Sequence, residues 1–281
     1  MSDQMSPTEP GRVGPVRPNS ANRLLRMVAS VWPPLLVFVF GGLLLEGVVR
    51  SFKIAPYILP APSRVLEAMG RRHEELFASL LSTATAAVVG FGISVCVGVV
   101  VAIVLSTSRL IRRAFYPYTV FFQTVPIVAI APLLVIWFDF GLMPVAASAF
   151  VASVFPVIAN TLAGFLSVDP NQRDLFRLYG ASRTATLVKL SFPAALPNII
   201  TGLRIAAGLA VIGAIVGEFV AGSLVRGGGL GVMVMVAKKN GNVDVIFAAV
   251  LFASLLGLAM FGAINFLGYV LLRRWHASEQ A

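Results

Sequence analysis

The sequence predicts an all-α integral membrane protein with about six transmembrane helices. Apolar residues make up 58% of the 281 residues and charged residues only 12%, whereas soluble globular domains carry about 25% charged residues. The mean hydropathy is +0.88. A membrane span needs about 20 mostly apolar residues, and the segments that qualify are 31–49, 81–106, 117–138, 142–166, 199–221 and 246–271.

The N-terminal segment differs in composition from the rest of the chain. Residues 1–30 are rich in Pro, Gly, Ser and Arg, which predicts a disordered cytoplasmic tail ahead of a membrane domain over residues 31–275. A signal peptide is the alternative, because Arg23 and Arg26 precede an apolar run. No small-residue cleavage site follows Val49, so we expect an uncleaved first span.

The third and fourth predicted spans are joined only by the turn Asp139–Gly141, which predicts a tight hairpin. Both spans contain prolines, at positions 126, 132, 144 and 156. Proline in a lipid-embedded helix frees backbone carbonyl groups and kinks the chain. Two consecutive kinked spans favour a moving or pore-lining element over a static anchor.

Basic residues predict the orientation. If the N-terminus is cytoplasmic, the inner segments hold the Arg and Lys clusters at 12–26, 109–113, 173–204 and 273–274, which outnumber the basic residues of the outer segments. Loops with excess Lys and Arg stay in the cytoplasm. We therefore expect both termini to be cytoplasmic. Residues 62–80 then form an outer amphipathic helix at the membrane interface, with a plain connector helix as the alternative.

The most polar segment between two spans is the loop 167–198. Asp169-Pro170-Asn171 is a turn that also begins a helix, and Asp174 is expected in its first turn, where a carboxylate complements the helix dipole. Gly180 is expected to end this helix. Ser182 is expected to cap a second helix, which presents Arg183 and Lys189, runs to Pro193 and is separated from the fifth span by Pro197.

This loop resembles the cytoplasmic EAA loop of bacterial ABC importer permeases, in which EAA is followed by a glycine and later by I, any residue, L and P. The matching residues are Asp174, Leu175, Phe176, Gly180, Leu190, Phe192 and Pro193. Leu175 and Phe176 are bulkier than the two alanines of the pattern. The segments ILPAPSRVLEAM at 58–69, QTVPIVAIAPLLVIWFDFG at 123–141 and GASRTATLVKLSFPAALPNIITGLRIAAG from 180 are similar to nitrate/sulfonate/taurine-type permeases.

The resemblance, which covers residues 50–271, implies a type I ABC importer permease fold in the bacterial inner membrane. It also implies that residues 174–182 dock into a groove on a cytoplasmic ABC ATPase dimer. The expected ATPase-coupling residues are Asp174, Leu175, Phe176, Arg177, Gly180, Ala181, Ser182 and Pro193. The other implied partners are an extracytoplasmic solute-binding protein and a second copy of the permease in a homodimer. An ordinary capped loop is the alternative.

No energy-converting or catalytic site is expected in this chain. It has no G-x-x-x-x-G-K-[ST] motif, so ATP and Mg are expected on the partner ATPase. The glycines Gly227–Gly229 and Gly231 lack a neighbouring lysine and read as a flexible outer turn. Cys96 is the only cysteine, and His73 and His276 lie far apart. We therefore expect no metal site, and the absence of a basic polar domain argues against nucleic-acid binding.

Polar residues within the spans are the candidates for the substrate path. Gln123, Thr124 and Asn160 are expected to line the pore, with helix–helix hydrogen bonding as an equal alternative. Glu218 is expected at the outer end of the fifth span, where it lines an outer vestibule or pairs with an outer Lys or Arg. Arg204 is expected to extend to the lipid headgroups. The small-residue series Gly202, Ala206, Ala210, Gly213 and Gly217 predicts close helix packing.

The expected substrate is a vitamin or vitamin precursor, such as riboflavin or the thiamine pyrimidine, because QTVPIVAIAPLLVIWF is most similar to that branch of the family. Nitrate, sulfonates and taurine are the alternatives. A secondary transporter is a more distant alternative, because it would need a relay of acids near the span centres. A membrane enzyme would need clustered His, Asp or Glu at one interface, and the sequence contains neither arrangement.

Overall fold

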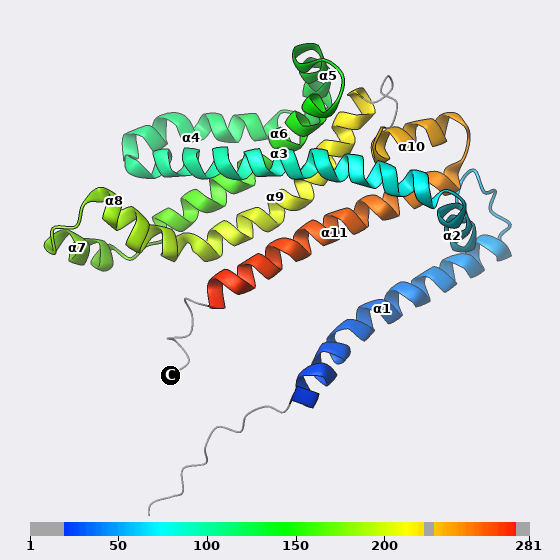
Figure 1. The fold of residues 1–281 in the computed structure, drawn as a ribbon, viewed down its shortest axis with the longest axis horizontal. Coiled ribbons are helices and arrows are strands. Elements are labelled where there is room, and N and C mark those ends of the chain that lie inside the picture. The colour runs from blue at the N-terminus through cyan, green and yellow to red at the C-terminus, as the bar shows by residue number, and fades with distance from the viewer. Residues whose placement is uncertain (1–19, 222–227, 274–281) are drawn as a thin grey trace, which may run out of the picture. The chain divides into compact units, whose positions relative to one another are not determined.

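The computed structural model describes residues 20–221 and 228–273, and every regular element in these ranges is a helix (Figure 1). The chain divides into two units, residues 1–54 and 55–281. The first unit holds α1 (Ser20–Ser51). The helices of the second unit are α2 (Pro62–Arg71), α3 (His73–Thr107), α4 (Arg109–Thr124), α5 (Ile127–Phe138), α6 (Leu142–Leu166), α7 (Pro170–Leu178), α8 (Arg183–Thr186), η1 (Leu187–Ser191), α9 (Phe192–Ala221), α10 (Leu230–Lys239) and α11 (Val243–Arg273).

Helix α1 encloses the predicted first span but begins earlier than expected. Its first residue, Ser20, lies within the segment predicted to be a disordered tail, so that prediction is wrong for residues 20–30. Residues 1–19 lie outside the described part of the chain. Near the other end of α1, Arg50 forms an ion pair with Glu46 one turn earlier. Residues four apart lie on the same face of a helix, which allows this pairing.

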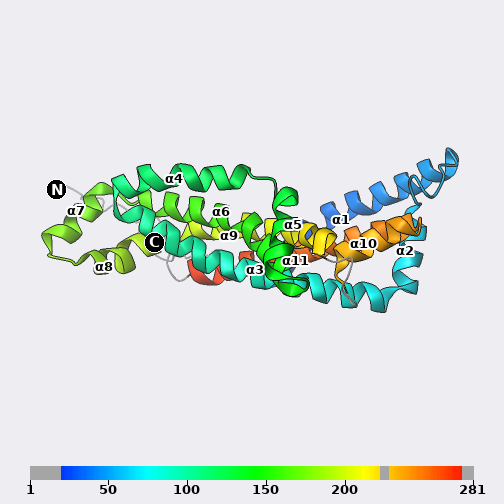
Figure 2. The ribbon, with the colours of Figure 1, turned by 90° about the horizontal axis from the view of Figure 1, so that it is seen from above.

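The second unit is built around three long helices, α3, α6 and α9, which lie side by side in both views (Figures 1 and 2). Their contact is apolar: Val157 and Phe165 of α6 and Leu203 of α9 belong to one buried cluster. Helix α11 packs against α9, and α10 packs against α9 and α11.

Small residues allow these helices to approach closely, as predicted for α9. A Cβ on Gly217 would lie 2.8 Å from Ser148 Oγ, and a Cβ on Gly90 of α3 would lie 2.4 Å from the Ala146 carbonyl oxygen of α6. Ser94 of α3 and Ser153 of α6 are hydrogen-bonded at 2.6 Å in the same buried interface. Close backbone packing with hydroxyl pairs is typical of helix association in lipid.

Two glycines of α9 provide a matched test of this packing. A Cβ on Gly213 would lie 2.7 Å from the Ser148 carbonyl oxygen, whereas a Cβ on Gly208 would have nothing within 4 Å. We expect Gly213→Ala to lower the free energy of unfolding by about 1–3 kcal/mol through overpacking. Gly208→Ala should raise it by up to about 1 kcal/mol through helix propensity. Thermal unfolding of the two purified variants measures the difference, and equal stabilities would contradict a close α6–α9 contact.

The predicted third span, residues 117–138, is not one straight helix. Helices α4 and α5 meet at a bend of 95°. Proline disfavours helical conformation in the residue before it, and Val125 and Pro126 both have extended backbones, with ψ of 123°. The chain therefore turns at Pro126. The expected turn between the third and fourth spans is present, with Asp139 at φ 60° and Gly141 at φ 131°.

Four helices in the described ranges are long and apolar enough to cross a membrane: His73–Thr107, Leu142–Leu166, Arg183–Ala221 and Val243–Leu272. The bent pair α4 and α5 would be a fifth span. Helix α1 is not among these four helices, and the structure describes the side chains of only part of it. The total of six spans remains a prediction.

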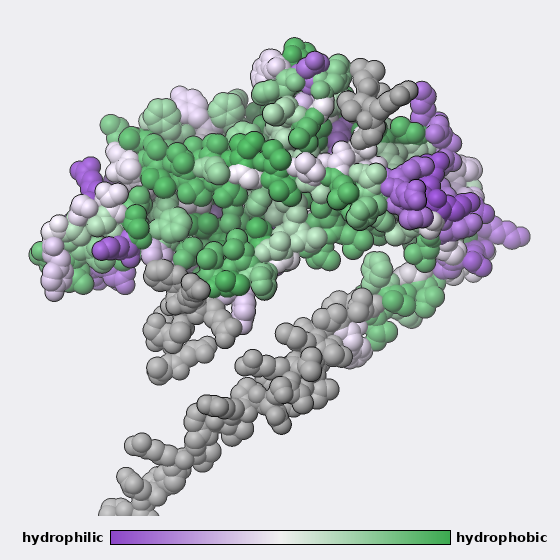
Figure 3. Space-filling model, viewed as in Figure 1, coloured by the Kyte–Doolittle hydropathy of each residue, from purple (hydrophilic) through white to green (hydrophobic). Residues whose placement is uncertain are grey.

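The predicted amphipathic helix 62–80 is divided between two helices. Helix α2 ends at Arg71, the backbone changes direction at Arg72 (φ −118°, ψ 27°), and residues 73–80 continue into α3. Helix α2 packs against α11, and its Val65 and Ala68 belong to a buried cluster that also holds residues of α10 and α11. Arg71 forms an ion pair with Asp244 of α11 at 3.7 Å. Polar residues gather at this end of the second unit, beside an apolar belt along the bundle (Figure 3).

Candidate functional site

The loop at the end of the second unit away from α2 is a capped helix, as the sequence predicted. The Asp169 side chain accepts a hydrogen bond from the Asn171 N–H at 2.8 Å and caps the start of α7. Gly180 ends the helix at φ 68°. There the Ala181 N–H donates to the Phe176 carbonyl and the Gly180 N–H to the Arg177 carbonyl, each at 2.9 Å. This is the Schellman pattern, which favours glycine.

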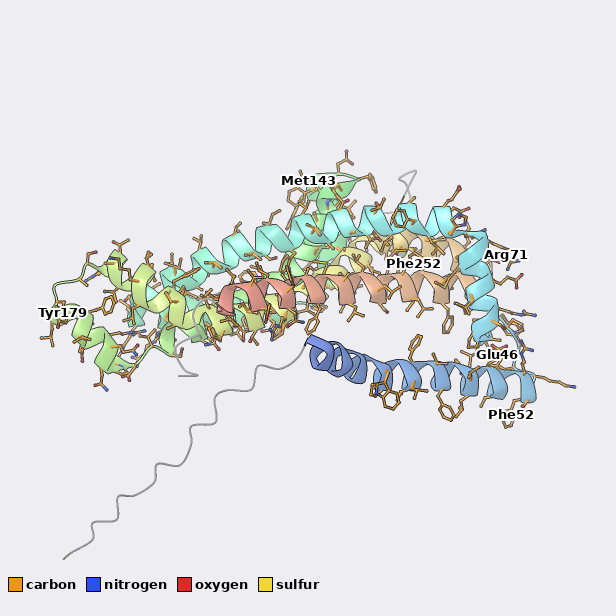
Figure 4. The ribbon with its side chains drawn as sticks, turned by 60° about the horizontal axis from the view of Figure 1, so that its bottom comes forward. Glu46, Phe52, Arg71, Met143, Tyr179 and Phe252 are labelled. Carbon is orange, nitrogen blue, oxygen red and sulfur yellow. The ribbon has the colours of Figure 1, made fainter. Side chains whose placement is uncertain are left out.

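Helix α7 is fixed at its base and exposed along its length. The Arg173 side chain donates to the Phe165 carbonyl at the end of α6. None of the residues of α7 is buried, and Leu175, Leu178 and Tyr179 are 50%, 84% and 83% exposed. Tyr179 lies at the tip of the loop and points away from the bundle (Figure 4). A rigid helix that presents apolar side chains to solvent is suited to docking into a partner.

One detail of the predicted loop is wrong. Asp174 lies in the second turn of α7, because the helix begins at Pro170 and its first turn holds no acidic residue. Its carboxylate instead faces Arg177 at 3.4 Å, an exposed pair that contributes little stability. The carboxylate that accepts a hydrogen bond from a backbone N–H group at the N-terminus of α7 is that of Asp169. Ser182 behaves as predicted, since its hydroxyl accepts from the Ala185 N–H at 3.2 Å.

The chain is helical without interruption from Arg183 to Ala221, so Pro193 and Pro197 do not separate the loop from the fifth span. Before Pro193 the helix widens to a π turn, η1, in which the Phe192 N–H donates to the Leu187 carbonyl. A proline ring clashes with the carbonyl group four residues earlier in an α-helix. A π turn changes that hydrogen-bond register, and the helix continues through the proline.

The opposite end of the bundle is organised by Glu218, which is only 3% exposed. Its Oε1 accepts from the Thr83 hydroxyl at 2.8 Å, and its Oε2 accepts from the Gly231 N–H at 2.7 Å. The Thr83 hydroxyl oxygen in turn accepts from the Leu230 N–H at 2.8 Å. The first N–H groups of a helix have no partner within the helix, so Glu218 and Thr83 together cap α10 and join it to α9 and α3.

Two glycines make this cap possible. A Cβ on Gly229 would lie 1.9 Å from Glu218 Oε1, and one on Gly231 would lie 2.8 Å from Glu218 Cβ. The prediction of a flexible turn is therefore wrong for these two residues, and Gly227 lies outside the described residues. Of the two roles expected for Glu218, pairing with Lys or Arg is absent within the described ranges.

A pocket of about 110 Å³ lies beside this cap. Glu218 lines it together with Ser82 of α3, the start of α6 at Gly141 and Leu142, and Gly229. The other role expected for Glu218, a position along an outer vestibule, stays a prediction.

The structure separates the remaining pore candidates. Gln123 and Thr124 are exposed at the end of α4, and the Thr124 hydroxyl donates to the Phe121 carbonyl of its own helix at 2.7 Å. Asn160 is half-buried and donates to the Pro156 carbonyl at 2.9 Å, with its Cβ facing Gly202 of α9. Asn160 thus lies at the contact between α6 and α9, and the pore-lining roles of Gln123, Thr124 and Asn160 stay predictions.

Sequence reasoning missed Thr83, Leu178 and Tyr179. Thr83 lies in an apolar helix 135 positions from Glu218, and no local pattern connects the two. Leu178 and Tyr179 are highly exposed apolar side chains, and their exposure follows from the position of α7 outside the bundle. Among the described residues, no three His, Cys, Asp or Glu side chains are grouped to hold a metal ion.

Comparison with known proteins identifies the family. Residues 94–276 match the family of the binding-protein-dependent transport system inner membrane component. The formylaminopyrimidine transport permease protein ThiX of Halalkalibacterium halodurans is 33% identical over 77% of this chain and 86% of its own length. The riboflavin transport system permease protein RibX of Chloroflexus aurantiacus is 31% identical over 87% of this chain and 88% of its own length.

The fold agrees with that match. An inward-facing structure of the MetNI methionine ABC transporter superposes with a TM-score of 0.63 at 17% sequence identity, over 72% of this chain and 98% of the matched chain. The apolar helices and the family together place the protein in the inner membrane as a multi-pass protein. The chain therefore belongs to the binding-protein-dependent inner-membrane components of ABC importers and has the type I importer permease fold.

Proposed function

We propose that this permease receives ATP-driven motion through α7 and moves a small, uncharged vitamin or vitamin precursor across the membrane. The observation that carries the proposal is the exposed loop helix. It is capped at both ends, tied to α6 by Arg173, and presents Leu175 to solvent. Such a helix has the rigidity to transmit displacement and an apolar surface for a partner to cover.

The partner is a cytoplasmic ABC ATPase dimer, which carries the ATP and Mg. Closure of the ATPase dimer moves α7, and the spans open outward to accept substrate; hydrolysis resets them. The docking residues are Asp174, Leu175, Phe176, Arg177, Gly180, Ala181 and Ser182, while Pro193 shapes the helix behind them. The permease works as a homodimer with both termini in the cytoplasm, and a solute-binding protein delivers substrate from outside.

The substrate proposal rests on two observations. The two relatives described above are named for formylaminopyrimidine and riboflavin transport. Among the described residues, Glu218 is the one ionisable side chain that is fully buried. A carboxylate on the substrate path repels anions, which argues against nitrate and against sulfonates that carry no positive charge.

Reconstitution tests the function and the substrate together. Proteoliposomes holding this permease with its co-purifying ATPase and binding protein should take up radiolabelled riboflavin or formylaminopyrimidine only when ATP is inside. Nitrate, taurine and an aliphatic sulfonate in excess should not compete. Uptake of taurine or nitrate instead would disprove the substrate proposal, and uptake without any ATPase would disprove the coupling proposal.

A further inference from the structure

One cation in the membrane part of the bundle has no partner among the described residues. Arg204 lies on α9, inside the span Arg183–Ala221. Its buried Nε atom makes no hydrogen bond, and no ion pair joins its guanidinium to another residue in the described ranges. An ionisable side chain at membrane depth is costly and needs a counter-charge.

The depth of Arg204 places its guanidinium within reach of one layer of headgroups. It is five residues inside the predicted span 199–221, which is about 7–8 Å along a helix. It lies nearer the α7–α8 end of α9 than the α10 end. A long Arg side chain buries its stem along apolar surface and carries its charge toward the interface.

The neighbouring helix gives the guanidinium a position beside lipid. A Cβ on Gly268 of α11 would lie 3.7 Å from Arg204 Nη2, so the charged group rests against a residue with no side chain. The flanking residues Phe266, Tyr269 and Val270 are exposed, and α11 is the least buried of the four spans. A wide apolar surface with an aromatic residue near its end is the surface that lipid chains and headgroups cover.

We propose that Arg204 of α9, where it lies against Gly268 of α11, binds the phosphate of an anionic phospholipid from the leaflet on the α7–α8 side. A guanidinium matches phosphate oxygens with two parallel N–H donors. Basic pockets between membrane helices on the cytoplasmic side are suited to anionic headgroups. The proposal is independent of the transported substrate.

Lipid retention measured by native mass spectrometry tests the site on the whole permease. The wild-type protein in detergent supplemented with phosphatidylglycerol should retain about one such lipid per chain more tightly than phosphatidylcholine. Arg204→Gln should weaken this retention about tenfold or more. Arg204→Lys keeps the positive charge, so it should lose less of this lipid retention than Arg204→Gln does. Arg64→Gln removes an exposed cation of α2, at the other end of the bundle, and should leave retention unchanged.

Three outcomes would overturn the proposal. Equal retention of phosphatidylglycerol by wild type and Arg204→Gln is the first. The second is displacement of the lipid by excess inorganic phosphate in wild type, which would assign the site to a soluble anion. In nanodiscs of phosphatidylcholine alone, loss of dimer in Arg204→Gln but not in wild type would assign the counter-charge to a second copy. The wild-type preference is measured without any substitution, so a misfolded variant does not leave the proposal untested.

Discussion

Leu175→Glu is expected to reduce ATP-driven uptake at least about tenfold, a change equivalent to roughly 1.4 kcal/mol. Half of the Leu175 surface is exposed in the isolated permease, so the new carboxylate stays solvated there and the fold is unaffected. In the assembled transporter, the proposed docking would remove that surface from water. Burying an unpaired charge in an apolar contact is strongly unfavourable.

The test compares uptake, ATPase co-purification and thermal stability in the same preparations. Thr184→Glu is the matched control, because Thr184 is exposed on α8 and lies outside the proposed docking residues 174–182. The control should keep near-normal uptake, and both variants should unfold at the wild-type temperature. Normal uptake by Leu175→Glu would remove α7 from the coupling mechanism.

Glu218→Ala is expected to lower the free energy of unfolding by about 1–3 kcal/mol, because that is the cost of one buried donor left without an acceptor. The Gly231 N–H loses its partner, whereas the Thr83 hydroxyl still accepts from the Leu230 N–H at 2.8 Å and still has the Ser79 carbonyl as an acceptor at 3.1 Å. Glu218→Gln retains one acceptor oxygen and should be less destabilised. Hydrogen exchange of the Leu230 and Gly231 amides should accelerate in both variants.

A second carboxylate controls for the lost charge. Glu74 lies exposed in the first turn of α3, where its removal should cost less than about 1 kcal/mol. Thermal unfolding and hydrogen exchange of Glu74→Ala should therefore resemble wild type. If Glu74→Ala and Glu218→Ala lost the same stability, the cap of α10 would contribute nothing specific.

The features that sequence predicted well are local ones. Asp169, Gly180 and Ser182 act within a few residues of their positions in the chain. The structure begins α7 directly after Asp169, as expected, and places Gly180 and Ser182 in the expected caps. The long apolar segments of α3, α6, α9 and α11 could likewise be predicted from the composition of the chain. Such features need no knowledge of which helix is the neighbour of which.

The failures arose where two effects compete or where distant residues meet. Four prolines were expected to kink their spans. The helix is broken at Pro126, with a bend of 95°, but Pro132, Pro144 and Pro156 lie inside the unbroken helices α5 and α6. The helix also continues through Pro193 after a π turn. The presence of a proline in the sequence does not by itself determine whether the helix breaks there or continues. Glu218 and Thr83 are brought together by the packing of α3 on α9. The space beside Gly229 and Gly231 is filled by Glu218, which no pattern of the glycines alone could reveal.

The π turn at Leu187–Ser191 also sets the azimuth of the loop about the axis of α9. Successive residues of an α-helix are about 100° apart, and a π turn accommodates one residue more than an α turn does. Without that residue, α7 and α8 would face a direction rotated by about 100° from the present one. One extra residue in a single turn therefore decides which side of the membrane helix the apolar surface of α7 faces, while leaving the packing of α9 in the bundle unchanged.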